Sequence, residues 1–227
     1  MKNTDIYRQR AKALTKQIQQ GVLFAIPAHD RRIDVATIGG LIQVLSHGAP
    51  FVQPFFLSGN SDIRSARNKI ANYFLDHRKE CQHLFWADSD IGFNLDDFLY
   101  MMQGPEDLVV APYSLKEVGA APVDFGFGFV RMHRRVLEGL RNWTVEDGRA
   151  ALNSYTDRGN LLTDFFVNGP LVGSRWFGED TGFFHLCATL GIKPRIESRC
   201  KLVHIGPFLY GYPQQLPGFM PVEAGAQ

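Results

Sequence analysis

The first half of the chain alternates short apolar segments with helix-like segments, and this alternation limits the folds that the sequence can adopt. Apolar runs at 22–27 and 54–57 are typical of strands, and each is followed by an acidic residue that can cap a helix, Asp34 and Asp62. Residues 62–77 place apolar side chains at helical spacing. Strands that alternate with helices in this way predict right-handed β-α-β units. We therefore expect an α/β fold with a Rossmann-like, mostly parallel central sheet flanked by helices.

Composition limits the size of the protein and its surroundings. With 227 residues the chain fits a single α/β domain, and its 24 basic and 23 acidic side chains create no overall field toward nucleic acid or an anionic membrane. Cys81, Cys187 and Cys200 are widely spaced and form no C-x-x-C pair, which argues against a disulfide framework or a zinc knuckle. No stretch is long and apolar enough for a membrane span or a signal peptide. The sequence predicts a cytoplasmic protein with no membrane partner.

The second half has shorter and less regular segments. Residues 125–132 alternate like a strand, residues 134–140 fit a short helix, and residues 142–160 are typical of a loop. A helix is predicted to begin after Gly178, and residues 195–204 are expected to form one closing strand. This mixed half is expected to supply the acceptor side of a binding site.

The two ends of the chain differ in composition from its middle. Asn3 or Thr4 can cap a helix that runs to Gln20 and carries a thin apolar stripe. From Tyr212 onward proline, glycine and glutamine dominate, which predicts a loose tail over residues 212–227. We find no internal repeat or interdomain linker, so residues 1–227 are treated as one domain.

An apolar run in the middle of the chain stops at two aspartates. Residues 84–93 read LFWADSDIGF, and Asp88 and Asp90 flank Ser89. In open α/β sheets, ligands bind beyond the carboxyl ends of such strands. Side chains two apart on an extended segment point the same way, so both carboxylates could face one divalent cation. The alternative is that these are solvated loop acids that cap a helix starting near Asn94.

Six segments carry a resemblance to a known family. In chain order the sequence contains IPAHD (26–30), SDIRSARN (61–68), FWADSDIGF (85–93), FGFGFVRM (125–132), GEDTGF (178–183) and LVHIG (202–206). Their order resembles that of GT-A fold glycosyltransferases, over about residues 22–211, and specifically the compact type found in bacteriophages and giant viruses. It is also similar to the TET-associated glycosyltransferases that modify hydroxymethylated pyrimidines in phage DNA. The resemblance implies a nucleotide-sugar-binding half at about 22–115 and an acceptor and catalytic half at about 116–211.

The resemblance implies a metal site and a donor site. Asp90 would be the direct ligand of Mn²⁺ or Mg²⁺, His204 a further ligand, and Asp88 would contact the ribose or reach the metal through water. The family preference for uridine makes a UDP-sugar the expected donor. If the enzyme is phage-encoded, its expected location is the cytoplasm of the host cell. An isolated histidine before a glycine is otherwise a structural residue. The residues expected to bind the donor are Pro27, Ala28, His29, Arg64, Arg67, Asp88, Ser89 and Lys116.

The resemblance also implies a catalytic pair. Asp180 matches the base that deprotonates the acceptor hydroxyl in inverting enzymes, and Glu179 would orient the acceptor; acids in the first turn of a helix equally complement its dipole. Arg64 and Arg67 lie three residues apart and can both face Asp88 or the diphosphate, although Arg64 also fits a solvated helix face. Lys116 could be a surface lysine.

The acceptor is the least determined part of this interpretation. Gly126 and Gly128 would allow close approach of a sugar or mark a bulge, and Trp176 could stack on an extruded base. Basic clusters at 31–32, 77–79, 133–135 and 195–201 could grip the phosphates of DNA that carries 5-hydroxymethylcytosine, or could be solvated faces. The alternatives are a glycan, protein or small-molecule acceptor, a sugar nucleotidyltransferase, or a non-catalytic nucleotide-sugar-binding module. The absence of a glycine-rich phosphate loop after residue 27 argues against the nucleotidyltransferase.

Overall fold

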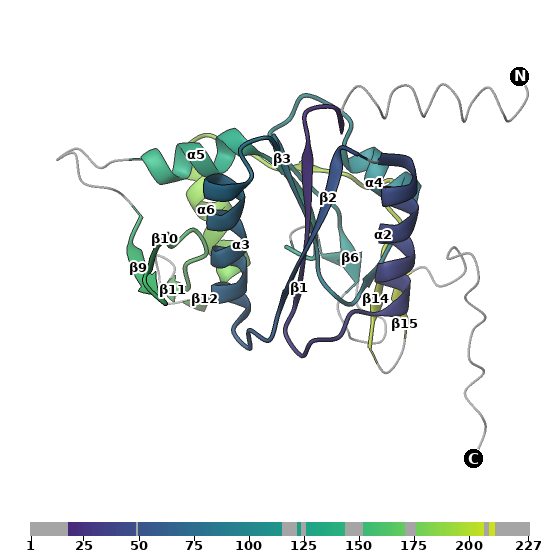
Figure 1. The fold of residues 1–227 in the computed structure, drawn as a ribbon, viewed down its shortest axis with the longest axis horizontal. Helices are drawn as coiled ribbons and strands as arrows, with labels where there is room; N and C mark the ends of the chain where they lie inside the picture. The colour runs from purple at the N-terminus through teal and green to yellow at the C-terminus, as the bar shows by residue number, and fades with distance from the viewer. Residues whose placement is uncertain are drawn as a thin grey trace, which may run out of the picture.

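A mixed six-stranded sheet forms the centre of the protein (Figure 1). The computed structural model describes residues 18–48, 50–114, 122–123, 126–143, 152–170, 176–206 and 209–211. Within these ranges, five strands of the sheet run parallel to one another and β8 is antiparallel to both of its neighbours. The predicted α/β class with a mostly parallel sheet is confirmed. In sheet order the strands are β13 (Arg195–Ile196), β5 (Leu108–Val110), β8 (Phe129–His133), β3 (His83–Ala87), β1 (Val22–Ala28) and β2 (Val52–Ser58).

Helices cover both faces of this sheet, as Figure 1 shows. α2 (Val35–Gly48) and α4 (Leu95–Met101) lie on one face, where their apolar side chains join those of Phe24 and Phe85 in one core cluster. The other face is covered by α3 (Ile63–His77), α5 (Arg134–Asn142) and α6 (Glu179–Thr189), which form a second cluster with Trp86 and Phe127. The sheet therefore separates two apolar cores.

The starts of three helices follow from local hydrogen bonding, and the sequence predicts two of the caps, Asp34 and Asp62. The side chain of Asp62 accepts hydrogen bonds from the backbone amides of Arg64 and Ser65 at the start of α3. Asp34 Oδ1 accepts one from the Ala36 amide at 2.8 Å, before α2. Asn94 forms a reciprocal capping box with Asp97 at the start of α4. Because α2 and α3 each follow a parallel strand, their N-terminal ends lie at the carboxyl-end edge of the sheet.

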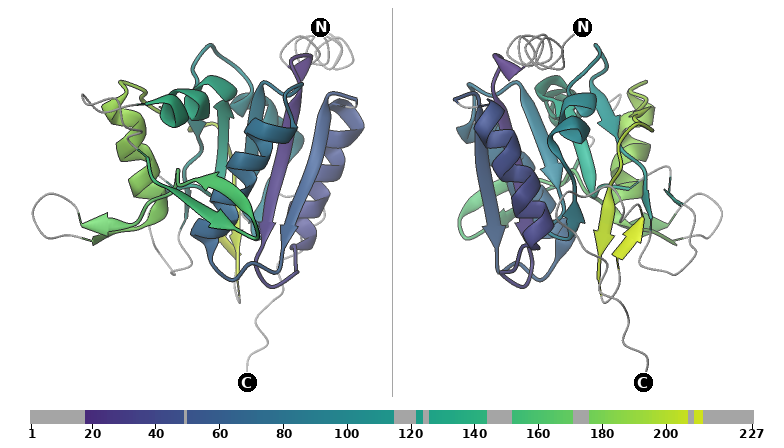
Figure 2. Two further views of the ribbon diagram at one scale, coloured as in Figure 1. Left: turned by 60° about the vertical axis from the view of Figure 1, so that its left-hand side comes forward. Right: turned by 90° about the vertical axis from the view of Figure 1, so that its right-hand side faces the viewer.

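Smaller sheets surround the central one. β14 (Val203–Ile205) pairs on one side with β4 (Ile91–Gly92) and on the other with β15 (Leu209–Gly211). β9 (Ser154–Asp157) and β10 (Asn160–Thr163) form a hairpin that packs beside α3 (Figure 2). Two short pairs complete the described part: β6 (Tyr113–Ser114) with β7 (Pro122–Val123), and β11 (Gly169–Pro170) with β12 (Trp176–Phe177).

Two predictions about the second half are wrong. Residues 195–204 do not form one closing strand, because β13 joins the central sheet and β14 joins the three-stranded sheet. Residues 142–160 are not a loop throughout, because β9 lies within them. Arg158 and Gly159 connect β9 to β10 with φ angles of 48° and 85°, the left-handed pair that a two-residue hairpin turn requires. The predicted N-terminal helix runs to Gln20, and its residues up to 17 lie outside the described residues, as does the predicted tail from Tyr212.

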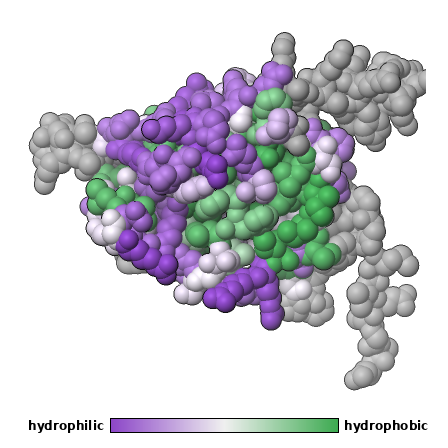
Figure 3. All heavy atoms as spheres, in the orientation of Figure 1, coloured by the Kyte–Doolittle hydropathy of each residue, from purple (hydrophilic) through white to green (hydrophobic). Residues whose placement is uncertain are grey.

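Exposed apolar side chains gather on the side of the molecule that carries α2 and β2. Figure 3 shows this apolar surface beside a hydrophilic region. Val35 and Ile42 of α2 are 77% and 58% exposed, and Phe56 of β2 is 45% exposed. No helix in the described ranges is long and apolar enough to cross a membrane.

Candidate functional site

The two aspartates of the D-x-D segment lie in a tight turn immediately after β3. The Asp88 amide donates to the carbonyl of Gly128 at 2.9 Å, and the Ile91 amide donates back to the Asp88 carbonyl at 3.2 Å. The segment is therefore not extended, contrary to the geometry on which the shared-cation prediction rests. Asp88 and Asp90 instead meet different partners, and each needs its own description.

Arg67 joins Asp88 to the start of α6. Its guanidinium donates to Glu179 Oε1 at 2.7 Å and to Asp88 Oδ2 at 3.4 Å, and it lies 4.9 Å from the centre of the Phe127 ring. The residue is only 4% exposed, and its buried Nε has no hydrogen-bond partner among the residues that the structure describes. A buried arginine that holds carboxylates from two distant segments assembles three charged groups at one place. The sequence prediction that Arg67 steadies Asp88 matches this arrangement.

The carboxyl group of Asp88 has a partly buried environment with both favourable and unfavourable neighbours. Trp86 Nε1 donates to Asp88 Oδ1 at 3.1 Å. Burial raises the pKa of Asp88, the charge of Asp90 raises it further, and Arg67 opposes both effects. Shifted carboxyl groups of this kind gather at functional sites.

Asp90 lies beside His204, which β14 brings back from the other end of the chain. The Ile205 amide donates to the Asp90 carbonyl at 2.8 Å, and His204 Nε2 lies 3.7 Å from Asp90 Oδ2. His204 Nδ1 lies 3.0 Å from the carbonyl oxygen of Ser114, so this nitrogen carries a hydrogen and donates it. The other ring nitrogen, Nε2, faces the Asp90 carboxylate.

An imidazole nitrogen and a carboxylate oxygen that face each other can share a cation, and this arrangement tests whether the implied metal fits. One imidazole nitrogen and one carboxylate oxygen suit a borderline ion such as Mn²⁺. Metal-binding histidines commonly hold their second nitrogen on a backbone carbonyl, as His204 does on Ser114. Across the described ranges, three or more His, Cys, Asp or Glu side chains do not come together in a group that could hold a metal. Asp90 and His204 could serve as two protein ligands of an ion, which would need its other ligands from substrate or water.

A pocket of about 620 Å³ opens beside Asp90 at the carboxyl end of β1. Pro27 and Ala28 are the last residues of β1, with buried side chains, whereas His29 is exposed and lines the pocket. The Ser89 carbonyl accepts from the Asp34 amide at 2.8 Å and so ties the D-x-D turn to the start of α2. The pocket is lined by His29, Asp30, Arg32, Ile33, Asp34, Val35, Ser89, Asp90, Ile205 and Gly206.

Glu179 and Asp180 occupy the first turn of α6. Glu179 is held by Arg67, and Asp180 Oδ1 accepts from the Thr181 amide at 2.7 Å. Gly182 fits closely against the preceding chain, since a Cβ there would lie 2.0 Å from the carbonyl oxygen of Val167. Both carboxylates are partly exposed, and Glu179 shares Arg67 with Asp88.

The glycines predicted to admit a sugar are covered by an aromatic side chain. A Cβ on Gly126 would lie 2.5 Å from Tyr113 Oη, and a Cβ on Gly128 would lie 2.8 Å from Tyr113 Cζ. Burial raises the pKa of Tyr113, and the charges of Asp88 and Asp180 raise it further. Glycine is therefore needed at both positions to admit the Tyr113 ring.

The structure does not place the side chains of three other predicted residues, Arg64, Lys116 and Trp176, beside Asp88. Arg64 does not join Asp88: its Nε donates to the Phe166 carbonyl at 2.8 Å, and its Nη2 pairs with Asp164. Lys116 lies outside the described residues. The backbone of Trp176, in β12, pairs with that of Pro170, in β11, but the side chain of Trp176 is not among those described.

Sequence reasoning missed an asparagine pair on α3 that fixes the approach to α6. Asn68 Oδ1 accepts from the amides of Phe165 and Phe166 at 2.8 and 3.0 Å. One turn later, Asn72 bonds both the amide and the carbonyl of Thr163 at 2.9 Å. Two asparagines four residues apart on one helix face are a visible signal, since buried amides need partners.

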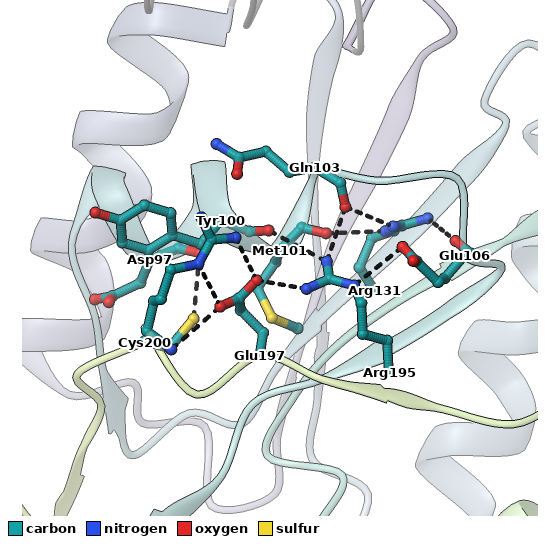
Figure 4. Close-up of polar contacts among 10 residues, drawn as sticks. Asp97, Tyr100, Met101, Gln103, Glu106, Arg131, Arg195, Glu197 and Cys200 are labelled. Carbon is teal, nitrogen blue, oxygen red and sulfur yellow. Dashed lines mark hydrogen bonds and ion pairs between the residues drawn. The ribbon is translucent and has the colours of Figure 1, made fainter.

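Two of the four basic clusters predicted for DNA, at 133–135 and 195–201, have arginines that pair within the protein. Arg134 is buried on backbone carbonyls, and Arg135 pairs with Asp107. Arg195 and Arg199 both bind Glu197, and Figure 4 shows the network that Glu197 and Arg195 share with Glu106. Burial alone would raise the pKa of Glu197, but hydrogen bonds from Arg199 and Arg195 outweigh it and lower this pKa to about 2. These arginines therefore have structural partners.

Neither a protein-family model nor a curated protein matches this sequence.

Proposed function

We propose that the protein is a metal-dependent GT-A glycosyltransferase that moves a sugar from a UDP-sugar to an acceptor hydroxyl with inversion. The observation that carries the proposal is the meeting of Asp90 with His204, whose Nε2 lies 3.7 Å from the carboxylate oxygen beside a pocket of about 620 Å³. The resemblance to GT-A enzymes, carried by the six sequence segments, supplies the reaction type.

The donor side of the reaction follows from the first half of the sheet. His29 and Ser89 line the pocket that would take the nucleotide, and Asp90 with His204 would hold the ion. The ion, when bound, neutralises the charge that develops on the diphosphate leaving group. Asp88, held by Arg67 and Trp86, would bind the ribose or an ion-bound water at the same edge.

The acceptor side of the reaction belongs to α6. Asp180 would accept the proton of the acceptor hydroxyl while its oxygen attacks the anomeric carbon and the bond from that carbon to the diphosphate breaks. Glu179 would orient the acceptor, since Arg67 fixes its carboxylate at 2.7 Å. The acceptor proposed first is 5-hydroxymethylcytosine or another hydroxymethylpyrimidine in phage DNA, and the same chemistry serves a glycan, protein or small-molecule hydroxyl.

The test is a transfer assay with Mn²⁺ and a panel of UDP-sugars, read by UDP release and by mass spectrometry of the acceptor. Duplex DNA with 5-hydroxymethylcytosine and a set of simple glycosides serve as acceptors. Asp90→Ala should abolish Mn²⁺-dependent UDP binding, whereas Asp180→Asn should retain that binding and lose transfer by about 100-fold or more.

The matched control is Glu138→Gln, which removes a half-exposed carboxylate from α5. This variant should transfer like the wild type. Normal turnover by Asp180→Asn would refute its role as base. Absence of both UDP release and UDP binding with every donor would refute the glycosyltransferase proposal as a whole.

A further inference from the structure

The ring of Tyr113 lies where the two parts of the candidate site meet. It packs edge-on against the His204 imidazole, with ring centres 5.3 Å apart and an angle of 88° between the planes. Its other neighbours are Gly126 and Gly128, whose missing side chains leave room for it. Asp88 and Asp180 are close enough for their charges to act on its hydroxyl.

The residue after Tyr113 acts on the same histidine. The carbonyl of Ser114 accepts the Nδ1 hydrogen of His204 at 3.0 Å, so β6 contacts this imidazole twice, once through a ring and once through the backbone. A hydrogen bond to Nδ1 fixes the tautomer but still permits the ring to rotate about that bond. An edge-to-face aromatic contact removes that freedom. The two contacts together determine where Nε2 points.

We infer that Tyr113 is a positioning residue that holds the His204 imidazole with Nε2 directed at Asp90. The inference rests on the proposed metal-dependent function, because it concerns one of the proposed ligands. The ring of Tyr113 acts through its packing, so phenylalanine should replace it. Leucine, which cannot make an edge-to-face contact, should not.

The first experiment measures binding of Mn²⁺ and UDP by calorimetry for three variants. Tyr113→Leu should bind at least 10-fold more weakly than the wild type, which is the range for loss of a group that orients a metal ligand. Tyr113→Phe should bind like the wild type. Tyr73→Leu is the matched control, because Tyr73 stacks on Phe55 in another part of the molecule. Equal binding by Tyr113→Leu and wild type, or equal loss in the leucine and phenylalanine variants, would overturn the inference.

A second measurement needs no metal and no activity. Long-range ¹H–¹⁵N spectra of the protein alone report the tautomer and order of the His204 ring. Tyr113→Leu should broaden or shift the His204 signals, and Tyr113→Phe should preserve them. Unchanged His204 signals in the leucine variant would overturn the inference, whether or not the wild type binds Mn²⁺ with UDP. Absence of Mn²⁺ and UDP binding by the wild type would count against the proposed function alone.

A methyl group added at Gly126 tests whether the space beside this glycine serves the Tyr113 ring. Gly126→Ala would place a methyl group 2.5 Å from Tyr113 Oη and should displace the ring, with a loss of Mn²⁺ and UDP binding like that of Tyr113→Leu. In the Tyr113→Leu background, the same alanine should cause no further loss, because the ring it displaces is gone. Additive losses in the double variant would show that Gly126 acts independently of Tyr113 and would contradict the inference.

Discussion

Two buried arginines near opposite ends of α3 have contrasting partners. Arg134 reaches the carboxyl end of the helix and donates to the carbonyls of Phe74, Leu75, Arg78 and Cys81. Arg67, in the first half of the helix, donates to two carboxylates, and within the described part of the chain its Nε has no partner. The carbonyl acceptors do not titrate, whereas the carboxylates do. The comparison teaches that partner chemistry, more than burial, separates an arginine that supports the fold from one that assembles a site.

Arg131 belongs with Arg134 in this comparison. Its guanidinium donates to the carbonyls of Met101 and Glu106 at 3.1 and 2.6 Å, at the end of α4 (Figure 4). Burial lowers the pKa of Arg131 to about 10, and the charge of Arg195 contributes to that shift. Arg131 and Arg134 therefore donate to backbone carbonyls at or near the ends of helices. Arg67, near the carboxyl end of β3, instead binds the carboxylates of Asp88 and Glu179.

The largest expected effect on stability comes from Arg134→Met. The substitution leaves several helix-end carbonyls buried without donors, so the free energy of unfolding should fall by about 3 kcal/mol. Urea unfolding followed by circular dichroism measures the loss. Because carbonyls do not titrate, and because the one carboxylate that Arg134 pairs with in the described ranges, Glu138, is half-exposed and lies 3.9 Å away, the loss should change little between neutral and acidic pH. Mn²⁺ and UDP binding by the folded fraction should persist.

The control for that variant is Arg135→Met, next along α5. Its side chain is exposed and pairs with Asp107 at the surface, so removing it should change stability little. A similar loss in both variants would contradict the structural role assigned to the buried arginine.

Arg67→Met should have a smaller effect that depends on pH. Removing Arg67 leaves Asp88 and Glu179 without their cation, so unfolding should cost about 2 kcal/mol less at neutral pH. Arg67 lowers the pKa of Asp88, so the attraction exists while Asp88 is ionised and disappears as falling pH protonates it. The difference from wild type should therefore shrink in acid. A loss that stays constant with pH would erase the contrast with Arg134.

The smallest expected effect concerns His83, at the amino end of β3. Burial lowers the pKa of His83 to about 3 from its ordinary 6.5, and the charge of Arg131 adds to the shift. Between these values the unfolded chain takes up a proton that the folded protein does not, so stability falls as pH falls. His83→Gln should remove roughly 1 kcal/mol of this loss one pH unit below the ordinary value. Urea unfolding across this pH range should show that the free energy of unfolding of the variant depends less steeply on pH than that of the wild type. An unchanged dependence would mean that other groups cause the acid sensitivity.

Local signals in the sequence predicted the first half well. Asp34, Asp62 and Asn94 lie beside the amides that they cap, so the starts of α2, α3 and α4 depend on neighbouring residues alone. The hairpin of β9 and β10 was also predictable in principle. The Arg158 and Gly159 turn follows a short alternating segment, but arginine is a poor indicator of a positive φ angle.

The rest of the site depends on pairings between distant segments. No local pattern separates residues 195–204 into strands of two different sheets, because the choice is made by β5 and β4. The contact of Tyr113 with His204 likewise joins segments that only the fold brings together. The resemblance to a family identified His204 and Asp180 as candidates, but it gave no reason to single out Tyr113.

The pairing of β14 with β4 has a consequence for the order in which the molecule is completed during synthesis. The central sheet has all six strands once residue 196 has emerged and paired with β5. Asp90 receives the backbone of Ile205 and the ring of His204 only later. A nascent chain can therefore complete the whole sheet before His204 reaches Asp90, and the proposed ability to hold an ion would be acquired as one of the last steps.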